Sequence, residues 1–270
     1  MKRRLNRAVS LLLTMVMLFS LLPTSAWAAD RATEIQKTEW EESYYVPSAL
    51  NASEWEFRKA FTMVNCDLAY ARYEKEIVDE DTGSLTYKYA YVIALDESSG
   101  SNYAIPDYPS GGAPWAQDDT MSEVYIEKGV TRIGSNAFAN KNLLTLVEIP
   151  ETVTSIGERA FSGDLELRAS ANGNTPLDLS HVTSFGAYAF SGCNSLGGTG
   201  GVTLNTASPA FTEIPDGLFS ATYLKKIELN DNITRIGDNA FAHCSLSGMT
   251  TIDLPDKLVE IGNGAFTRQT

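Results

Sequence analysis

The sequence has few of the residues on which metal centres and disulfide frameworks depend. Its 270 residues include two histidines and three cysteines. Two histidines leave little room for a histidine-based metal centre, and three cysteines do not form a paired framework. Basic residues are also scarce, since 21 Lys and Arg stand against 34 Asp and Glu, a formal net charge of −13. We therefore expect no metal, no cofactor and no nucleic-acid partner, because nucleic acids require clustered cations.

Long hydrophobic runs are missing apart from one near the N-terminus. A basic start, Lys2–Arg7, precedes the apolar run Leu11–Leu22, which has about a dozen residues. A membrane-spanning helix needs roughly 20. Ala26 and Ala28 supply the small side chains that signal peptidases accept. We predict a secretory signal peptide over residues 1–28, a secreted or cell-surface location and no membrane span. A membrane anchor is the alternative.

One pattern recurs six times from residue 124 onward. Each copy has an apolar-polar-apolar triplet, two further apolar positions, a glycine in most copies and a phenylalanine, usually preceded by alanine. A clear copy is Ile227-Glu228-Leu229, Ile233, Ile236-Gly237 and Ala240-Phe241. The phenylalanines that close the copies are Phe138, Phe161, Phe190, Phe219, Phe241 and Phe266.

The physics of one copy predicts a stacked array. The triplet has the period of a short strand with one buried face. Pro150 and Pro255 follow such triplets and end them, because proline has no N–H for the ladder. One copy buries too few side chains to offset the entropy of ordering its backbone, so copies must share faces. Residues 119–270 are predicted to form about six stacked coils.

The sixth copy, Ile252–Phe266, and the others resemble the BspA-type leucine-rich repeat of bacterial surface and secreted proteins. The segment Ile105–Trp115 is similar to the one that opens such arrays. This resemblance covers about residues 104–270. It implies an α/β repeat solenoid, a right-handed leucine-rich-repeat superhelix of about six coils with short strands. Members of the family are associated with adhesion and host-protein binding, so the resemblance implies binding without catalysis.

Residues 29–118 lack the repeat, and we predict a small α+β capping region that is acidic and rich in aromatic residues. Ser53 and Glu56 are a candidate capping box, and the apolar spacing that follows predicts a helix near 54–72. The alternative is that Leu68–Ala71 begins a strand. Residues 76–95 are predicted to form a hairpin. Such a region would cover the first coil, because the end of a repeat array needs a polar cover.

Two features of the predicted hairpin permit a second interpretation. Asp79 and Asp81 lie in its turn and weakly resemble an oxygen-ligand calcium loop, but no bidentate glutamate follows at the right distance. We favour a simple acidic turn. Tyr87, Tyr89 and Tyr91 alternate along its second strand and could stack on sugar rings. Their continuation into an apolar stretch favours a core position instead.

The three cysteines are predicted to be free and mostly buried. Cys193 and Cys244 occupy equivalent positions two copies apart. Neighbouring coils stack at about 4.8 Å, which places these positions roughly 10 Å apart. A disulfide requires Cα atoms within about 7 Å.

The central residue of each triplet must point away from the buried face, and together these residues form a strand-face ladder. Its members are Tyr125, Glu148, Asp178, Thr203, Glu228 and Asp253. Four of the six are acidic, and like charges on neighbouring strands repel. We predict that this ladder binds a ligand and favours cationic groups or a basic partner. The alternative is an ordinary solvated strand face.

The sequence as a whole predicts a non-catalytic protein- or glycan-binding module of the adhesion type. One alternative is a structural stalk, or the leading part of a longer surface protein. A less favoured one is an enzyme with its site in residues 29–118, a region with no histidine. The apolar residues of the last copy would face an open edge, which predicts possible end-to-end self-association.

Overall fold

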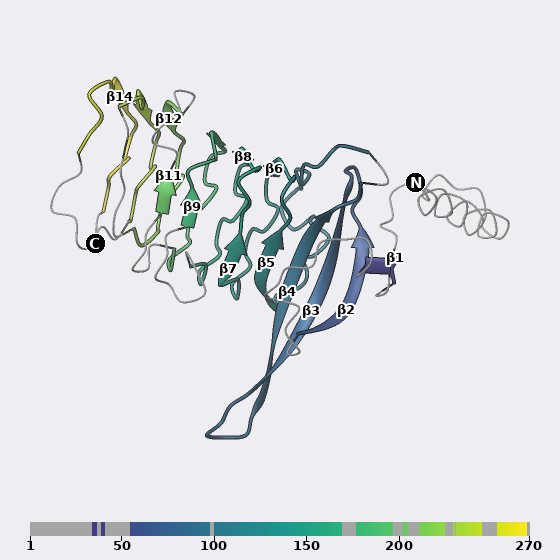
Figure 1. Ribbon diagram of the computed structural model, residues 1–270. Coiled ribbons are helices and arrows are strands. Elements are labelled where there is room, and N and C mark those ends of the chain that lie inside the picture. The colour runs from purple at the N-terminus through teal and green to yellow at the C-terminus, as the bar shows by residue number, and fades with distance from the viewer. Residues whose placement is uncertain are drawn as a thin grey trace. The chain divides into compact units, whose positions relative to one another are not determined.

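The computed structural model describes most of the chain after residue 54 (Figure 1). The predicted signal peptide and the side chains of Thr203 and Glu228 lie outside the described part. The described residues are 34–36, 39–40, 55–97, 100–168, 177–196, 202–204, 211–224, 229, 231–244 and 253–268.

A six-stranded sheet joins the N-terminal region to the first two repeats. Its strands, in spatial order, are β1 (Glu34–Ile35), β2 (Trp55–Thr62), β3 (Leu68–Val78), β4 (Leu85–Leu95), β5 (Met121–Ile126) and β7 (Leu146–Glu148). Strands β1 to β4 pair antiparallel, whereas β4–β5 and β5–β7 pair parallel. The parallel step from β4 to β5 places the hairpin strand where the strand of a preceding repeat would lie.

The helix predicted near residues 54–72 is wrong, because these residues form β2 and the start of β3. The four-residue spacing of Phe57 and Phe61 suggested one helix face. A β-bulge between Phe57 and Lys59 changes the strand's alternation. Phe57 therefore packs on one side of the sheet against Tyr73, and Phe61 packs on the other side against Tyr70.

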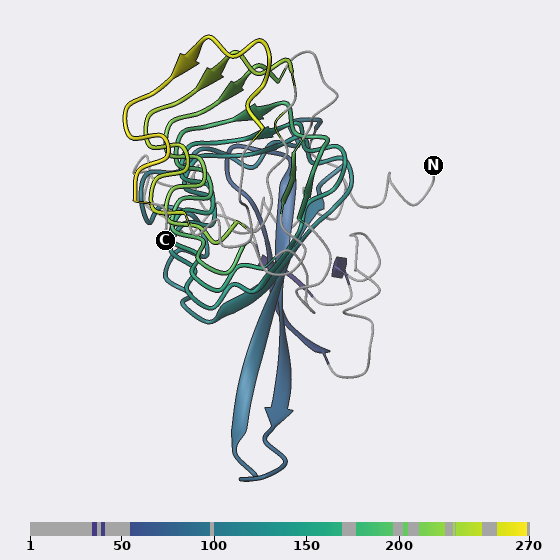
Figure 2. The ribbon, with the colours of Figure 1, turned by 90° about the vertical axis from the view of Figure 1, so that its left-hand side faces the viewer.

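The predicted hairpin is present and is formed by β3 and β4, paired from Leu68 with Leu95 to Val78 with Leu85. Its far end reaches beyond the neighbouring strands (Figure 2). In the turn, Asp79 Oδ1 accepts hydrogen bonds from the backbone N–H of Thr82, at 2.7 Å, and of Asp81. A hydrogen bond from the Thr82 hydroxyl is the main cause that lowers the pKa of Asp79, and the two backbone bonds lower it further. The Asp79 carboxylate is thus hydrogen-bonded within the turn itself.

The tyrosines of β4 divide between solvent and core. Tyr87 is 47% exposed near the turn, Tyr89 is half-buried, and Tyr91 is buried. The guanidinium of Arg72 lies 4.0 Å from the centroid of the Tyr89 ring. The core position predicted for this stripe is therefore confirmed for Tyr91 and wrong for Tyr87.

The later repeats pair through short parallel strands, each with an equivalent strand of a neighbouring repeat. The remaining strands are β6 (Arg132–Ile133), β8 (Ser155–Ile156), β9 (Leu177–Leu179), β10 (Ser184–Phe185), β11 (Val202–Leu204), β12 (Glu213–Ile214), β13 (Arg235–Ile236) and β14 (Glu260–Ile261). Strand β8 lies between β6 and β10, and β13 lies between β12 and β14. Strand β9 pairs with β11.

A column of stacked aromatic rings fills the interior of the repeats. The six repeat phenylalanines stack successively, with ring centroids 5.2–6.0 Å apart between neighbours. Trp115 heads the column, 5.2 Å from Phe138 with nearly parallel rings. Its indole N–H donates to the carbonyl oxygen of Ala137 at 2.7 Å. The column therefore begins before the first repeat.

The glycine that follows the second apolar position is required by close approach between repeats. A Cβ on Gly157 would lie 2.5 Å from the backbone nitrogen of Ser135. One on Gly186 would overlap the backbone of Glu158. The N–H of Gly186 donates to the carbonyl of Ile156 at 2.8 Å, which holds the two backbones together. A side chain here would force neighbouring repeats apart.

The cysteines are free, as predicted, and two of the three are buried. Thr222 occupies the equivalent position in the repeat between Cys193 and Cys244, and its hydroxyl lies 3.4 Å from Cys244 Sγ. Each of the two buried thiols donates to the carbonyl of a phenylalanine in the preceding repeat, Phe161 or Phe219. These bonds occupy the thiols within the stack.

Candidate ligand-binding face

The strand-face ladder is exposed where its side chains are described beyond the first repeat. Glu148, Asp178 and Asp253 are all exposed. In register, Tyr125 pairs with Glu148 and Asp178 pairs with Thr203. Alternation along the strands explains the exposure, because the flanking residues of β9, Leu177 and Leu179, are buried.

Tyr125 does not face solvent, so that part of the prediction is wrong. It is only 3% exposed and packs in an apolar cluster with Trp40, Ala71 and Val92. Its hydroxyl donates to Glu123 Oε2 at 2.7 Å. Residues of the N-terminal region cover this end of the sheet. The accessible part of the ladder therefore begins at Glu148.

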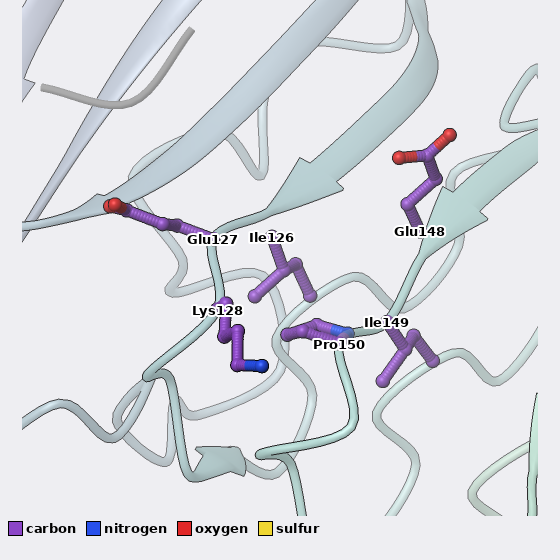
Figure 3. Close-up of a pocket in the computed structure, with 6 residues that line it drawn as sticks. All are labelled: Ile126, Glu127, Lys128, Glu148, Ile149 and Pro150. Carbon is purple, nitrogen blue, oxygen red and sulfur yellow. The ribbon is translucent and has the colours of Figure 1, made fainter. Parts of the chain in front are cut away.

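A recess lies beside Glu148, where β5 and β7 end. It has a volume of about 300 Å³ and is lined by Ile126, Glu127, Lys128, Glu148, Ile149 and Pro150. We call it the Glu148 recess. Strand β7 ends at Glu148, as expected when Pro150 follows. Figure 3 shows Glu127 and Glu148 at opposite sides of the recess, with Ile126 and Pro150 between them.

The charged groups of the recess differ in what they contact. Glu127 Oε2 accepts the backbone N–H of Leu95 at 2.7 Å. The Lys128 ammonium pairs with the carboxylate of Glu151, and both side chains are well exposed. For Glu148, the described part of the chain supplies no hydrogen-bond or ion-pair partner. Glu148 thus supplies one carboxylate, at the rim of the recess, that is open to a ligand.

The carboxylate of Glu148 is in an unfavourable environment. Loss of surrounding water raises its pKa, and the nearby negative charge of Glu123 raises it further. The pKa of Glu127 is also raised, by burial first and then by Glu97, although its bond to Leu95 opposes this. Both shifts disfavour the ionised forms, so a cation placed here would be stabilised.

The sequence pattern did not single out Glu123, Glu127 or Lys128. Glu127 and Lys128 follow a strand instead of standing at its centre, and Glu123 precedes the first triplet. A usable signal was present, because Glu127-Lys128-Gly129 interrupts the apolar residues directly after Ile126. This signal indicates a recess only together with Pro150, which lies far away in the sequence and lines the same recess in the structure.

A second row of polar residues, Glu213, Arg235 and Glu260 on the short strands, forms ion pairs within the protein. Arg235 on β13 pairs with Glu213 on β12, and also with Glu260 on β14 at 3.3 Å. It pairs with Asp216 at 3.0 Å as well. This row is a network of exposed ion pairs between repeats. It offers less unpaired charge than the Glu148 recess.

Among the residues that the structure describes, no group of three or more His, Cys, Asp or Glu side chains is placed to hold a metal ion. In the same part of the chain, no helix has both the length and the apolar character needed to cross a bilayer.

Parallel strands in repeat register, a column of stacked phenylalanines and an exposed strand face together define a stacked repeat protein. The chain belongs to the BspA-type leucine-rich repeat family. The family model for the BspA type leucine rich repeat region matches residues 115–198 and 174–270, with six copies. The leucine-rich-repeat fold predicted from the sequence is thereby confirmed.

Several solved structures are similar to the chain, each over 72% of its length. A leucine rich cell surface protein from Faecalibacterium prausnitzii A2-165 is 27% identical with a TM-score of 0.46, and the match spans 50% of that protein. A leucine-rich repeat protein from Eubacterium ventriosum is 20% identical, with a TM-score of 0.29 over 68% of its chain. One from Bacteroides ovatus is 19% identical, with a TM-score of 0.32 over 60%. No curated protein matches the chain.

Proposed function

We propose that this protein is an exported, non-catalytic binding module that holds a protein or glycan ligand on its strand-face ladder. One observation carries the proposal: Glu148, Asp178 and Asp253 are exposed at the same position of parallel repeats, and a recess lies beside the first of them. Repeat proteins commonly bind ligands on such continuous faces. The family match supports a surface or secreted location.

The finer architecture supports the same proposal. We infer that the repeats wind as a right-handed superhelix, because equivalent strands pair parallel and in register from one repeat to the next. Each repeat then presents its central strand residue at the same position of the face. A ligand that spans several repeats would meet a regular series of side chains, most of them acidic.

Charge reversal on the ladder tests this function. The double variant Glu148→Lys/Asp178→Lys should bind a verified extracellular partner at least tenfold more weakly, because it replaces two acidic contacts by repulsive ones. Partners would be found by pull-down against extracellular host proteins and a cell-wall glycan array. Affinity would then be measured by biolayer interferometry at two salt concentrations.

A matched control separates the ladder from net charge. Glu80→Lys/Asp81→Lys changes the charge by the same amount in the hairpin turn, where both side chains are exposed. It should bind the partner with unchanged affinity. Equal losses in the two double variants, or no loss in either, would contradict a ligand site on the ladder.

The edge of the last described repeat, at β14, is a second candidate contact surface. Ile261 is 48% exposed, whereas its equivalents Ile133, Ile156 and Ile236 are buried. Strand β14 pairs with β13 on one side. We propose end-to-end association of two copies through this edge. Sedimentation velocity should show dimers that Ile261→Asp converts to monomers, and a wild-type protein that stays monomeric at high concentration would refute it.

A further inference from the structure

We propose that the Glu148 recess receives the side chain of a lysine or arginine from a protein ligand. This inference rests on the proposed binding function and specifies its chemistry. It favours a basic polypeptide over a glycan. Three features support it: the shape and lining of the recess, the carboxylate left without a partner in the described chain, and the residues that continue the face.

The lining of the recess suits a side chain with an apolar stem and a charged end. Ile126, Ile149 and Pro150 supply apolar surface, and the Glu148 carboxylate lies at one side (Figure 3). Lysine and arginine have this composition, because their methylene stems pack on apolar surface while the cationic group reaches a polar site. The volume, about 300 Å³, is at the small end of the range of ligand pockets, about 300–1,000 Å³. It fits one side chain better than an oligosaccharide.

The lining lacks an aromatic ring on which a sugar could stack. None of the six lining residues is aromatic. A flat aromatic ring offers an apolar platform for the C–H face of a sugar, and the amide groups of Asn and Gln bind its hydroxyls. Neither feature is present among these six residues. The chemistry of the recess therefore selects a cation on a flexible apolar stem.

The charges of the recess leave one position for that cation. Leu95 N–H occupies Glu127, and Glu151 neutralises Lys128. Glu148 has no partner in the described chain, and it lies near Glu123, whose carboxylate accepts the Tyr125 hydroxyl. A ligand ammonium or guanidinium bound to Glu148 would offset this repulsion between carboxylates and donate charge-assisted hydrogen bonds to Glu148.

The same face continues with the chemistry that a basic polypeptide requires. Asp178 occupies the ladder position of the next repeat, and Ser180 N–H fixes its carboxylate at 2.9 Å. Asp253 repeats the position later in the array and is exposed. A single amino acid would use the recess alone. An extended segment with several basic residues would use the recess and the acidic positions that follow.

Peptide titration tests the inference. The full chain would be titrated, by isothermal calorimetry, with the peptide acetyl-Gly-Lys-Gly-Lys-Gly-Lys-Gly-amide and with an analogue that has norleucine at each lysine. The analogue keeps the apolar stem and loses the charge. The lysine peptide should bind at least tenfold more tightly. Equal affinities for the two peptides would overturn the proposal, as would no binding of either.

Variants assign the effect to the recess. Glu148→Gln should weaken binding of the lysine peptide at least fivefold, because it removes the charge and keeps the shape. Glu166→Gln makes the same change at an exposed glutamate beside Arg168 and should bind like wild type. Thermal unfolding of Glu148→Gln should be unchanged or shifted upward, since repulsion from Glu123 is lost. Unchanged peptide affinity in Glu148→Gln would refute the assignment.

The two proposals can fail separately. If Glu148→Lys/Asp178→Lys abolishes binding of a verified partner while the lysine and norleucine peptides bind equally, the ladder binds a ligand but the recess does not select a cation. If that double variant leaves every verified partner bound as before, the proposed function itself fails.

Discussion

Phe190→Ala is expected to lower the free energy of unfolding by about 3–5 kcal/mol, the usual cost of emptying a buried aromatic site. Phe190 is fully buried and stacks between Phe161, at 5.2 Å, and Phe219, at 5.9 Å. Phe185 contacts the same ring at its edge. Urea denaturation followed by far-ultraviolet circular dichroism would measure the loss.

The position of Phe190 within the column adds a second expectation. Each repeat of such an array is stabilised mainly by its neighbours, so a cavity in the middle weakens the coupling between the two halves. The transition should broaden or divide into two steps. Phe266→Ala is the matched control, because Phe266 is half-buried and, among the described residues, stacks only on Phe241, at 5.4 Å. A similar loss in both variants, each with a single sharp transition, would show that the column does not couple the repeats.

The repeat array could be predicted because six copies report the same structure. A residue that is ambiguous in one copy is resolved by its equivalents, and the column of phenylalanines follows directly from their common register. Residues 29–118 offered no such averaging. There the spacing of Phe57 and Phe61 fitted a helix, and the β-bulge that explains it leaves no mark in the sequence.

The packing at the start of the array could not be predicted from the repeat pattern either. Trp115 heads the phenylalanine column, and Ile105 donates its N–H to the carbonyl of Arg132, as one repeat does to the next. Strand β4 supplies the parallel neighbour of β5. Together these segments replace a repeat without sharing its sequence. Packing alone requires a flat apolar ring, a buried isoleucine and a strand at these places.

The positive φ angles in the repeats could not be predicted from the sequence either. The residue two positions before each repeat phenylalanine has positive φ in all six repeats: Asn136, Arg159, Tyr188, Gly217, Asn239 and Gly264. Asparagine and glycine adopt this conformation readily, but arginine and tyrosine do so at a cost. Arg159 and Tyr188 also contact each other, with the guanidinium 5.0 Å from the ring centroid. The stack imposes the conformation whatever the residue.

For the candidate site, the sequence predicted which residues leave the buried face but not what covers them. Alternation placed Tyr125 and Glu148 on the same side, and their register confirms this. Trp40 belongs to the cluster that buries Tyr125, although it is far away in the sequence. The recess was unpredictable for the same reason, since two successive repeats each supply three of its lining residues.

Lys141→Met is expected to lower the free energy of unfolding by about 3–5 kcal/mol, because hydrogen bonds to a charged group contribute about 1.5–3 kcal/mol each and are not strictly additive. Lys141 is only 2% exposed. Its ammonium donates to the carbonyl oxygens of Trp115, at 2.9 Å, of Ala116, at 2.6 Å, and of Asp118, at 3.1 Å. Methionine fills a similar volume but donates no hydrogen bond, so three carbonyls would lose their donor.

The loss of stability in Lys141→Met should be largest where the N-terminal region meets the repeats. Burial lowers the pKa of Lys141, while the charges of Asp119, Asp118 and Asp164 oppose that shift and favour the ammonium. The segment that carries the three carbonyls also carries Trp115, so loosening it should expose the head of the aromatic column. Hydrogen exchange of residues 115–118 should therefore accelerate more than exchange in the later repeats.

Lys128→Met is the matched control for this charge-to-thioether change. Lys128 is well exposed and pairs with an equally exposed Glu151, a contact worth about 0–1 kcal/mol. Its free energy of unfolding, from urea denaturation, should stay within about 0.5 kcal/mol of wild type. If Lys141→Met were as stable as Lys128→Met, the buried ammonium would not be what fastens the Trp115 segment to the first repeat. The stacking of Trp115 on Phe138 would then have to hold that junction by itself.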